Sequence, residues 1–284
     1  MARRPRQRVA VLHDGSLAGW NTSEIWAPEL HYMRGKWYIY YAADSGENED
    51  HRMGVLESVT EDPQGAYTDR GMLYTGDEIE TGANNRWAID GTPLEMGGKL
   101  YFLWSGWEGL ADEQWLYIAE MADPWTIRTN RVKLAENDEY LWERVSESMD
   151  ERGLNEGPQI LENDGVVYVI YSVSGSWQPA YKLAQLSIRA DAVPMEPGNW
   201  TKPDSPVFTG SDVVHGVGHA SFTTSPDGSE DWVLYHTKVD TIPGWDRVVH
   251  LQPFTWTENG PDFGAAVPAG VPLRLPSGER PPVE

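Results

Sequence analysis

The chain of 284 residues carries a formal net charge of −22, contains no cysteine, and is 40% hydrophobic. The acidic charge argues against nucleic acid as a partner, because a phosphate backbone would be repelled. The lack of cysteine excludes disulfides and thiolate metal sites, and no apolar run is long enough to predict a membrane helix. The acid excess suits a salt-adapted protein or simply a highly soluble surface, and localisation is left undecided.

The first 22 residues predict the end of a structural unit rather than a complete one. The basic start, 1–8, is followed by no apolar stretch and so does not form a secretory signal. The stretch Arg8-Val-Ala-Val-Leu12 resembles the outer strands that end later units, and a loop over 14–22 follows it. We therefore interpret 1–22 as the last strand of a first unit whose other strands are not in this chain.

Four copies of one pattern divide the rest of the chain. In each copy a glycine-containing turn precedes an aromatic strand, and these strands begin at residues 36, 99, 166 and 231, about 65 residues apart. A repeat of this length, in a chain with 28 glycines and 20 prolines, predicts a turn-rich repeat architecture. The expected units are 23–86, 87–152, 153–214 and 215–284. Strands are expected near 29–33, 37–42, 52–58, 68–74, 92–95, 100–104, 115–120, 132–135, 248–255 and 263–267.

Four-stranded units of this size predict an all-β propeller, in which the innermost strand of each blade lines a central channel. The segment before each glycine turn holds one polar residue: Glu29, Asp90, Glu156 or His219. If these residues occupy equivalent points on the inner strands, they meet in one pocket. Residues 23–284 then form a single propeller domain, and 1–22 is the remnant of the first blade.

Segments around these residues resemble glycoside hydrolase family 43. They are Trp26-Ala-Pro-Glu29, Ala88-Ile-Asp-Gly91, Leu154-Asn-Glu-Gly-Pro158, Gly216–Phe222 and Gln252–Gly264. The last segment is similar to that of members known as α-L-arabinofuranosidases. The resemblance runs from about Val9 to Val267. It implies a five-bladed propeller that hydrolyses arabinofuranosyl or xylosyl linkages with inversion, on plant cell-wall arabinan or arabinoxylan, and without a required cofactor.

The resemblance also implies roles for single residues. Glu156 matches the proton donor, and Asp90 matches the residue that adjusts the pKa of that acid. His219 matches a channel histidine beside water or a structural calcium ion, and Arg247 matches an arginine that contacts substrate. Inverting hydrolysis needs one protonated and one ionised carboxyl group, and a nearby carboxylate such as Asp90 would raise the pKa of Glu156.

Aromatic side chains and one further carboxylate complete the predicted substrate site. Trp26, Trp107 and Trp177 offer flat faces to the apolar side of a sugar ring, although packing between blades is the ordinary role of a tryptophan. Glu29 either binds substrate or fixes its loop. His215 and His219 do not form a zinc pattern, because their strand-and-glycine context does not place both rings on one face.

The chain departs from the family at the general base. Relatives carry an aspartate in an Asp-Pro context on the first inner strand, and this chain has no such segment. Asp14 follows an outer strand, and Asp62 and Asp123 lie in outer-strand regions of later blades. We therefore expect weak or absent hydrolysis from this chain, with a non-catalytic carbohydrate-binding propeller as the alternative. The expected partner is an oligo- or polysaccharide; a monomer is favoured, with pairing through open blade edges as the other state.

Overall fold

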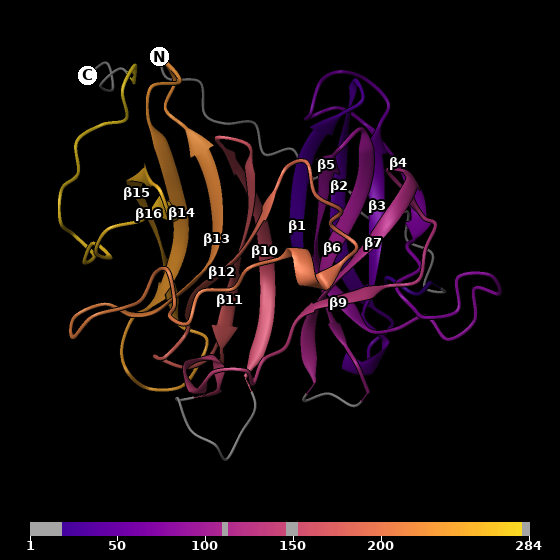
Figure 1. The fold of residues 1–284 in the computed structure, drawn as a ribbon, viewed down its shortest axis with the longest axis horizontal. Coiled ribbons are helices and arrows are strands. Elements are labelled where there is room, and N and C mark those ends of the chain that lie inside the picture. Colours follow the sequence, from indigo (N-terminus) through magenta and orange to yellow (C-terminus); the bar gives the residue numbers. More distant parts are fainter. Residues whose placement is uncertain (1–18, 110–112, 146–152, 280–284) are drawn as a thin grey trace.

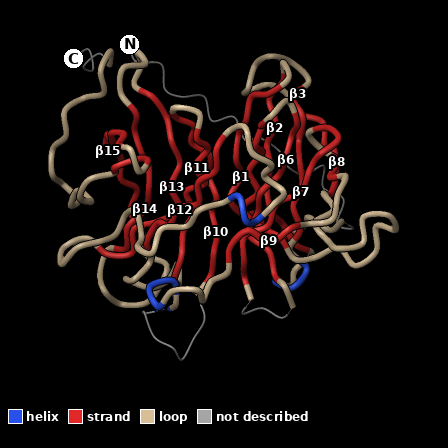
Figure 2. The backbone as a smooth tube through the Cα atoms, viewed as in Figure 1, coloured by secondary structure: helices blue, strands red, loops and turns tan. Residues whose placement is uncertain are grey.

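The computed structural model describes residues 19–109, 113–145 and 153–279, which form an all-β structure (Figure 1). The strands are β1 Ser23–Met33, β2 Lys36–Asp44, β3 Arg52–Ser58, β4 Tyr67–Met72, β5 Ala88–Met96, β6 Lys99–Trp107, β7 Gln114–Asp123, β8 Thr126–Ile127, β9 Val132–Ala135, β10 Leu154–Asn163, β11 Val166–Ser174, β12 Lys182–Arg189, β13 His215–Thr224, β14 Asp231–Lys238, β15 Arg247–Thr257 and β16 Gly260–Asp262. Short 3-10 helices are η1 Asn48–Asp50, η2 Leu141–Glu143 and η4 Pro197–Asn199, and Figure 2 shows how little helix the described chain contains.

Antiparallel pairing groups consecutive strands into blades. β1 to β4 form one sheet in sequence order, and β13 to β16 form another. Between them, the group β5 to β9 and the group β10 to β12 join into one larger sheet through a single parallel pairing of Leu154 with Gln114. The predicted all-β class is confirmed. A fifth blade stays a prediction, because the strand predicted at 8–12 lies outside the described residues.

Tight glycine turns connect the inner strand of three blades to the aromatic strand. Both central residues have positive φ in Arg34-Gly35 (51° and 82°), Gly97-Gly98 (59° and 76°) and Asp164-Gly165 (47° and 74°). Two successive positive φ angles match the right-handed twist of the flanking strands, so these turns fix the register of each hairpin. The predicted glycine turns therefore act as register markers.

One strand prediction fails near the end of the last blade. The last strand, expected at 263–267, is instead Gly260–Asp262, because Gly264 turns the chain at φ 65°. The carbonyl groups of Phe263 and Ala265 accept hydrogen bonds from the side-chain amide of Gln252 rather than from a neighbouring strand. In the third blade the outer edge of β12 carries two isolated pairings, Leu183 with Phe208 and Ser187 with Thr201.

Aromatic strands supply the packing between blades. Tyr40 of the first blade packs on Phe102 of the second with ring centroids 5.0 Å apart, and both side chains are fully buried. A second core contains Leu103 and Val169, from the second and third blades, and a third contains Ile170 and Val233, from the third and fourth. The second and third blades thus present alternate residues of their aromatic strands to their two neighbours, as a period of two requires.

The outer face of the first blade is covered by residues just before β1. Trp20 stacks on Tyr41 with a centroid separation of 5.9 Å, and the side-chain amide of Asn21 donates a hydrogen bond to the Tyr41 hydroxyl. Gly54 makes this approach possible, because a Cβ atom there would lie 2.6 Å from the Trp20 ring. In the described part of the chain no helix is long and apolar enough to cross a membrane.

Candidate active site

Every inner strand contains a bulge at its middle. Regular pairing is interrupted between Trp26 and Glu29 in β1, Ile89 and Thr92 in β5, Glu156 and Gln159 in β10, and Gly218 and Ser221 in β13. The first residue inside each bulge has a left-handed backbone: Ala27 at φ 41°, Asp90 at 55°, Gly157 at 57° and His219 at 49°. Residues other than glycine rarely adopt this conformation, and bulges redirect side chains near active sites.

The bulges correct one expectation about register. Asp90 and His219 occupy equivalent points, since each is the left-handed residue of its bulge. Glu29 lies two residues after its left-handed neighbour, and Glu156 lies one residue before Gly157. The predicted equivalence of all four polar residues was therefore wrong. Asp90, Glu156 and His219 still act on one another electrostatically, so the bulges bring them together from different register positions.

Asp90 is held against the strand that carries Glu156. Its side chain is 2% exposed, and its Oδ2 accepts a hydrogen bond of 3.1 Å from the backbone N–H of Gly157. The next residue, Gly91, must lack a side chain, because a Cβ atom there would lie 2.1 Å from the ring of Phe102. The Asp-Gly pair thus combines a carboxylate directed at β10 with close packing against the aromatic strand behind it.

Glu156 is a buried carboxyl group with a phenol beside it. It is 7% exposed, and its Oε1 accepts a hydrogen bond of 2.5 Å from the hydroxyl of Tyr181. Burial and then the charge of Asp90 raise the pKa of Glu156, while His219, the Tyr181 hydroxyl and Arg247 lower it; the net direction is upward. A carboxyl group with a raised pKa is suited to donate a proton near neutrality.

Asp90, Glu156 and His219 shift one another's pKa. Burial raises the pKa of Asp90 as well, but the positive charge of His219 and the N–H of Gly157 oppose that effect. Burial would lower the pKa of His219, yet Asp90, Glu156 and Glu29 together raise it above its ordinary value. A protonated His219 imidazole favours the ionised form of both carboxyl groups, yet the net shift of each pKa is upward.

Glu29 forms a tie across the channel. One of its oxygens lies 2.8 Å from Nε2 of His31, and the other accepts a hydrogen bond of 2.5 Å from the amide of Gln159 on β10. Both carboxylate oxygens therefore have partners within the protein. This arrangement favours the second of the two predicted roles, in which Glu29 fixes the channel.

The predicted tryptophans lie in different environments. Trp107 is 8% exposed and stacks on Trp87 at 4.4 Å with nearly parallel rings, so its position suits core packing better than sugar binding. Trp26 is half-buried, and one of its faces stacks on His51 at 3.9 Å.

Trp177 has a partner that the sequence did not indicate. Its ring lies 6.2 Å from that of Trp245, which is 69% exposed, and its carbonyl accepts a hydrogen bond from the backbone N–H of Gly244. The guanidinium carbon of Arg247 lies 4.7 Å from the Trp245 ring centroid. In the sequence Trp245 lies two positions before the predicted arginine, Arg247. This spacing was the signal that could have identified Trp245 as a residue of the site.

Arg247 connects this aromatic pair with the carboxyl groups. Its Nη1 lies 3.3 Å from Nε2 of His236, while its Nε and Nη2 are buried and have no hydrogen-bond partner among the described residues. Burial, then Arg247 and His219, lower the pKa of His236 to about 3, so this imidazole is neutral and accepts from the guanidinium. Two unpaired donors of Arg247 are thus available to a polar ligand.

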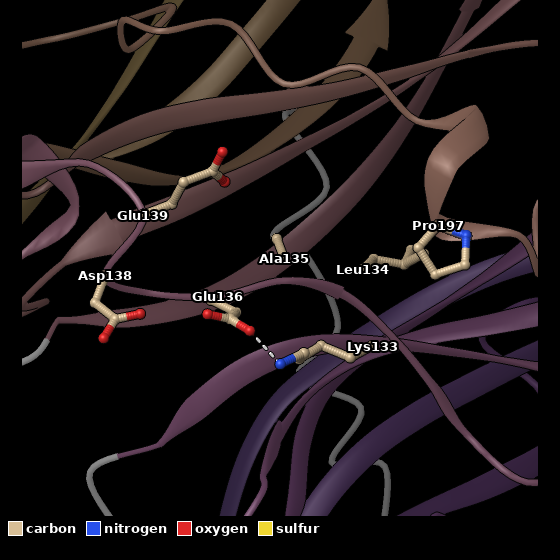
Figure 3. Close-up of a pocket in the computed structure, with 7 residues that line it drawn as sticks. All are labelled: Lys133, Leu134, Ala135, Glu136, Asp138, Glu139 and Pro197. Carbon is tan, nitrogen blue, oxygen red and sulfur yellow. Dashed lines mark hydrogen bonds and ion pairs between the residues drawn. The ribbon is translucent and has the colours of Figure 1, made fainter.

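A separate surface pocket of about 390 Å³ lies between β9 and η4 (Figure 3). It is lined by Lys133, Leu134, Ala135, Glu136, Asp138, Glu139 and Pro197, none of which is a predicted site residue. Within it Lys133 forms an ion pair with Glu136. Nowhere in residues 19–109, 113–145 and 153–279 do three or more ligating side chains form a metal-binding group.

Comparison with known proteins identifies the family of this arrangement. The model of glycosyl hydrolases family 43 matches residues 6–261. Alpha-L-arabinofuranosidase 43 of Humicola insolens is 33% identical over 270 residues, which is 90% of this chain and 53% of that protein. The extracellular exo-alpha-(1->5)-L-arabinofuranosidase of Streptomyces avermitilis is 33% identical over 98% of this chain and 57% of its own length. The chain thus spans little more than half the length of these relatives.

Solved structures agree with the sequence comparison. The α-L-arabinofuranosidase of Lactobacillus brevis superposes with a TM-score of 0.76 at 35% identity, covering 87% of this chain and 78% of that one. A thermostable family-43 glycoside hydrolase superposes with a TM-score of 0.74 at 24% identity and supports the β-propeller fold. The chain therefore belongs to glycosyl hydrolase family 43.

Proposed function

We propose that this protein is an inverting glycoside hydrolase that removes α-L-arabinofuranosyl residues from arabinan or arabinoxylan, with β-xylosyl linkages as the competing specificity. The observation that carries the proposal is the buried pair of Glu156 and Asp90 on facing inner strands, linked through the N–H of Gly157. In this assignment Glu156 gives its proton to the leaving oxygen, and Asp90 keeps that proton in place before transfer. The two related arabinofuranosidases support arabinose over xylose.

The general base is the one role in the proposed mechanism to which we assign no residue. Asp14 lies outside the described residues, and both oxygens of Glu29 are engaged by His31 and Gln159. Asp62 is exposed and its side chain accepts from the backbone N–H of Gln64, so it is held within its own turn. Because the sequence contains no Asp-Pro segment ahead of Trp26-Ala-Pro-Glu29, we propose that these 284 residues hydrolyse glycosides slowly for want of a carboxylate to activate water.

Hydrolysis of 4-nitrophenyl α-L-arabinofuranoside with and without sodium azide tests this function. Azide is a nucleophile that needs no base, so it should increase nitrophenolate release and yield the arabinosyl azide of inverted configuration. Rapid turnover in water alone would show that a base is present. The alternative, a non-catalytic carbohydrate-binding propeller, is favoured only if azide has no effect and arabino-oligosaccharides still bind.

Replacing Asp90 with asparagine is expected to shift the pH dependence. The charge of Asp90 raises the pKa of Glu156, so the variant should have a lower Glu156 pKa. Because the acid acts while protonated, the alkaline limb of the azide-assisted rate should move to lower pH. The exposed Glu95→Gln, also on β5, is the control and should leave the limb in place; an unmoved limb in Asp90→Asn would contradict the role of Asp90.

Replacing Trp245 with alanine is expected to weaken sugar binding. Stacking of an aromatic ring on an apolar surface contributes about 0.5–1.5 kcal/mol, which corresponds to a roughly 2- to 12-fold loss of affinity. Calorimetric titration with arabino-oligosaccharides measures the loss. Tyr32→Ala, another exposed aromatic residue, is the control, and equal losses in both variants would remove Trp245 from the substrate site.

A further inference from the structure

Tyr181, which lies just before β12, contacts the carboxyl group of Glu156. Its hydroxyl donates to Oε1 of Glu156 at 2.5 Å, and the tyrosine is only 1% exposed. Neither the repeat pattern nor the matched motifs pointed to this residue. A hydrogen bond to a carboxylate is shorter and stronger than one to a neutral group, so this contact distinguishes the two states of Glu156.

The phenol ring is clamped in place. A Cβ atom at Gly218 of β13 would lie 2.0 Å from the Tyr181 ring, so the ring fills the space that a side chain would need. The ring also stacks on the imidazole of His236 on β14 at 5.5 Å, nearly parallel at 8°, and the Ser172 side chain hydrogen-bonds to the Tyr181 hydroxyl. His236 is itself fixed by Arg247. The hydroxyl therefore has little freedom to leave Glu156.

We propose that Tyr181 is a positioning residue for the acid: its hydroxyl occupies Oε1 of Glu156, so that Oε2 carries the proton for transfer. This inference rests on the proposed function. As azide forms a bond to the anomeric carbon, the bond from that carbon to the leaving oxygen breaks; its electron pair stays on the oxygen, which takes the proton from Oε2. The negative charge left on Glu156 then receives a charge-assisted hydrogen bond from Tyr181.

Other charges face the same carboxyl group and set the background for this effect. Asp90 of β5 acts on it with a negative charge, while His219 of β13 and Arg247 of β15 act with positive charges. The Tyr181 hydroxyl lowers the pKa of Glu156 in the same direction as the two cations, because a donated hydrogen bond favours the ionised carboxyl group. Loss of the hydroxyl alone should therefore strengthen the hold of Glu156 on its proton.

Tyr181→Phe tests the inference without any need for turnover. In protein labelled with ¹³C at the glutamate δ-carboxyl groups, NMR titration gives the pKa of Glu156, and Glu156→Gln assigns its signal. We expect the pKa to rise by about one unit in the variant, from a hydrogen bond of about 1.5 kcal/mol. Tyr171→Phe is the matched control, since Tyr171 is equally buried and its hydroxyl has no partner among the described residues.

An unchanged Glu156 pKa in folded Tyr181→Phe would overturn the proposal. Should that variant not fold, 3-fluorotyrosine at position 181 gives a second measurement: its more acidic hydroxyl is a stronger donor, so the pKa should fall, and no fall would be equally decisive. The proposed function and the role of Tyr181 can be tested separately. An azide-assisted rate in Glu156→Gln equal to that of the parent chain would end the proposed function. A Glu156 titration unmoved in Tyr181→Phe, together with a lowered azide-assisted rate in Glu156→Gln, would end only the role of Tyr181.

Discussion

Replacing Glu156 with glutamine is expected to lower the azide-assisted hydrolysis of phenyl α-L-arabinofuranoside by roughly 10²- to 10⁴-fold, the usual contribution of a general acid. Glutamine keeps the shape of the side chain and accepts the hydrogen bond from Tyr181, but it has no proton to give. Phenoxide is a poor leaving group, so its departure depends on protonation. The initial rate of phenol release at several pH values measures the effect.

Leaving-group dependence provides the internal check on this result. With 2,4-dinitrophenyl α-L-arabinofuranoside the departing oxygen needs little protonation, so Glu156→Gln should lose far less activity. Glu162→Gln changes an exposed glutamate on the same strand and should behave as the unmodified chain. Equal losses with both substrates would mean that Glu156 supports the structure of the site rather than donating the proton.

Gly91→Ala is expected to destabilise the fold. The new methyl carbon would lie 2.1 Å from Cζ of Phe102 and 2.9 Å from Cε of Met53, and both of these side chains are fully buried. A core that must absorb an additional methyl group is destabilised by about 1–3 kcal/mol. Urea denaturation followed by tryptophan fluorescence gives the change in the free energy of unfolding.

Gly198→Ala supplies the comparison for that experiment. Gly198 has open space around the added Cβ atom and no positive φ, so this variant should retain the stability of the parent chain or exceed it slightly. If Gly91→Ala unfolded at the same urea concentration as Gly198→Ala, the close packing of Asp90-Gly91 against Phe102 would be refuted.

Local patterns predicted the strands well because their causes are local. Successive side chains of the run Lys36-Trp-Tyr-Ile-Tyr-Tyr41 point to opposite faces of the sheet. Arg34-Gly35 supplies the two positive φ angles that a tight hairpin needs. These features depend on neighbours a few residues away. The all-β class followed from them, whereas the family resemblance came from the motifs around Glu29, Asp90, Glu156 and His219.

The site was predicted less completely, because its details depend on contacts between blades. A bulge is defined by the pairing of two strands, so the sequence could not reveal that Glu156 and Asp90 occupy different register positions. Tyr181 meets Glu156 only because Gly218, on another blade, leaves room for its ring. The sequence predicted that Trp107 could stack on a sugar ring, but Trp87 covers one of its faces.

The tie between Glu29 and Gln159 bears on how the molecule matures. It joins residues 130 positions apart, so it cannot form until the third blade has been made. Contacts between distant residues form late, because the chain between them must first be ordered. A chain still emerging from the ribosome therefore holds Glu29 and Asp90 before it can form this hydrogen bond. Its pocket should acquire sugar affinity only in the last steps of folding, which makes ligand binding a sensitive reporter of refolding.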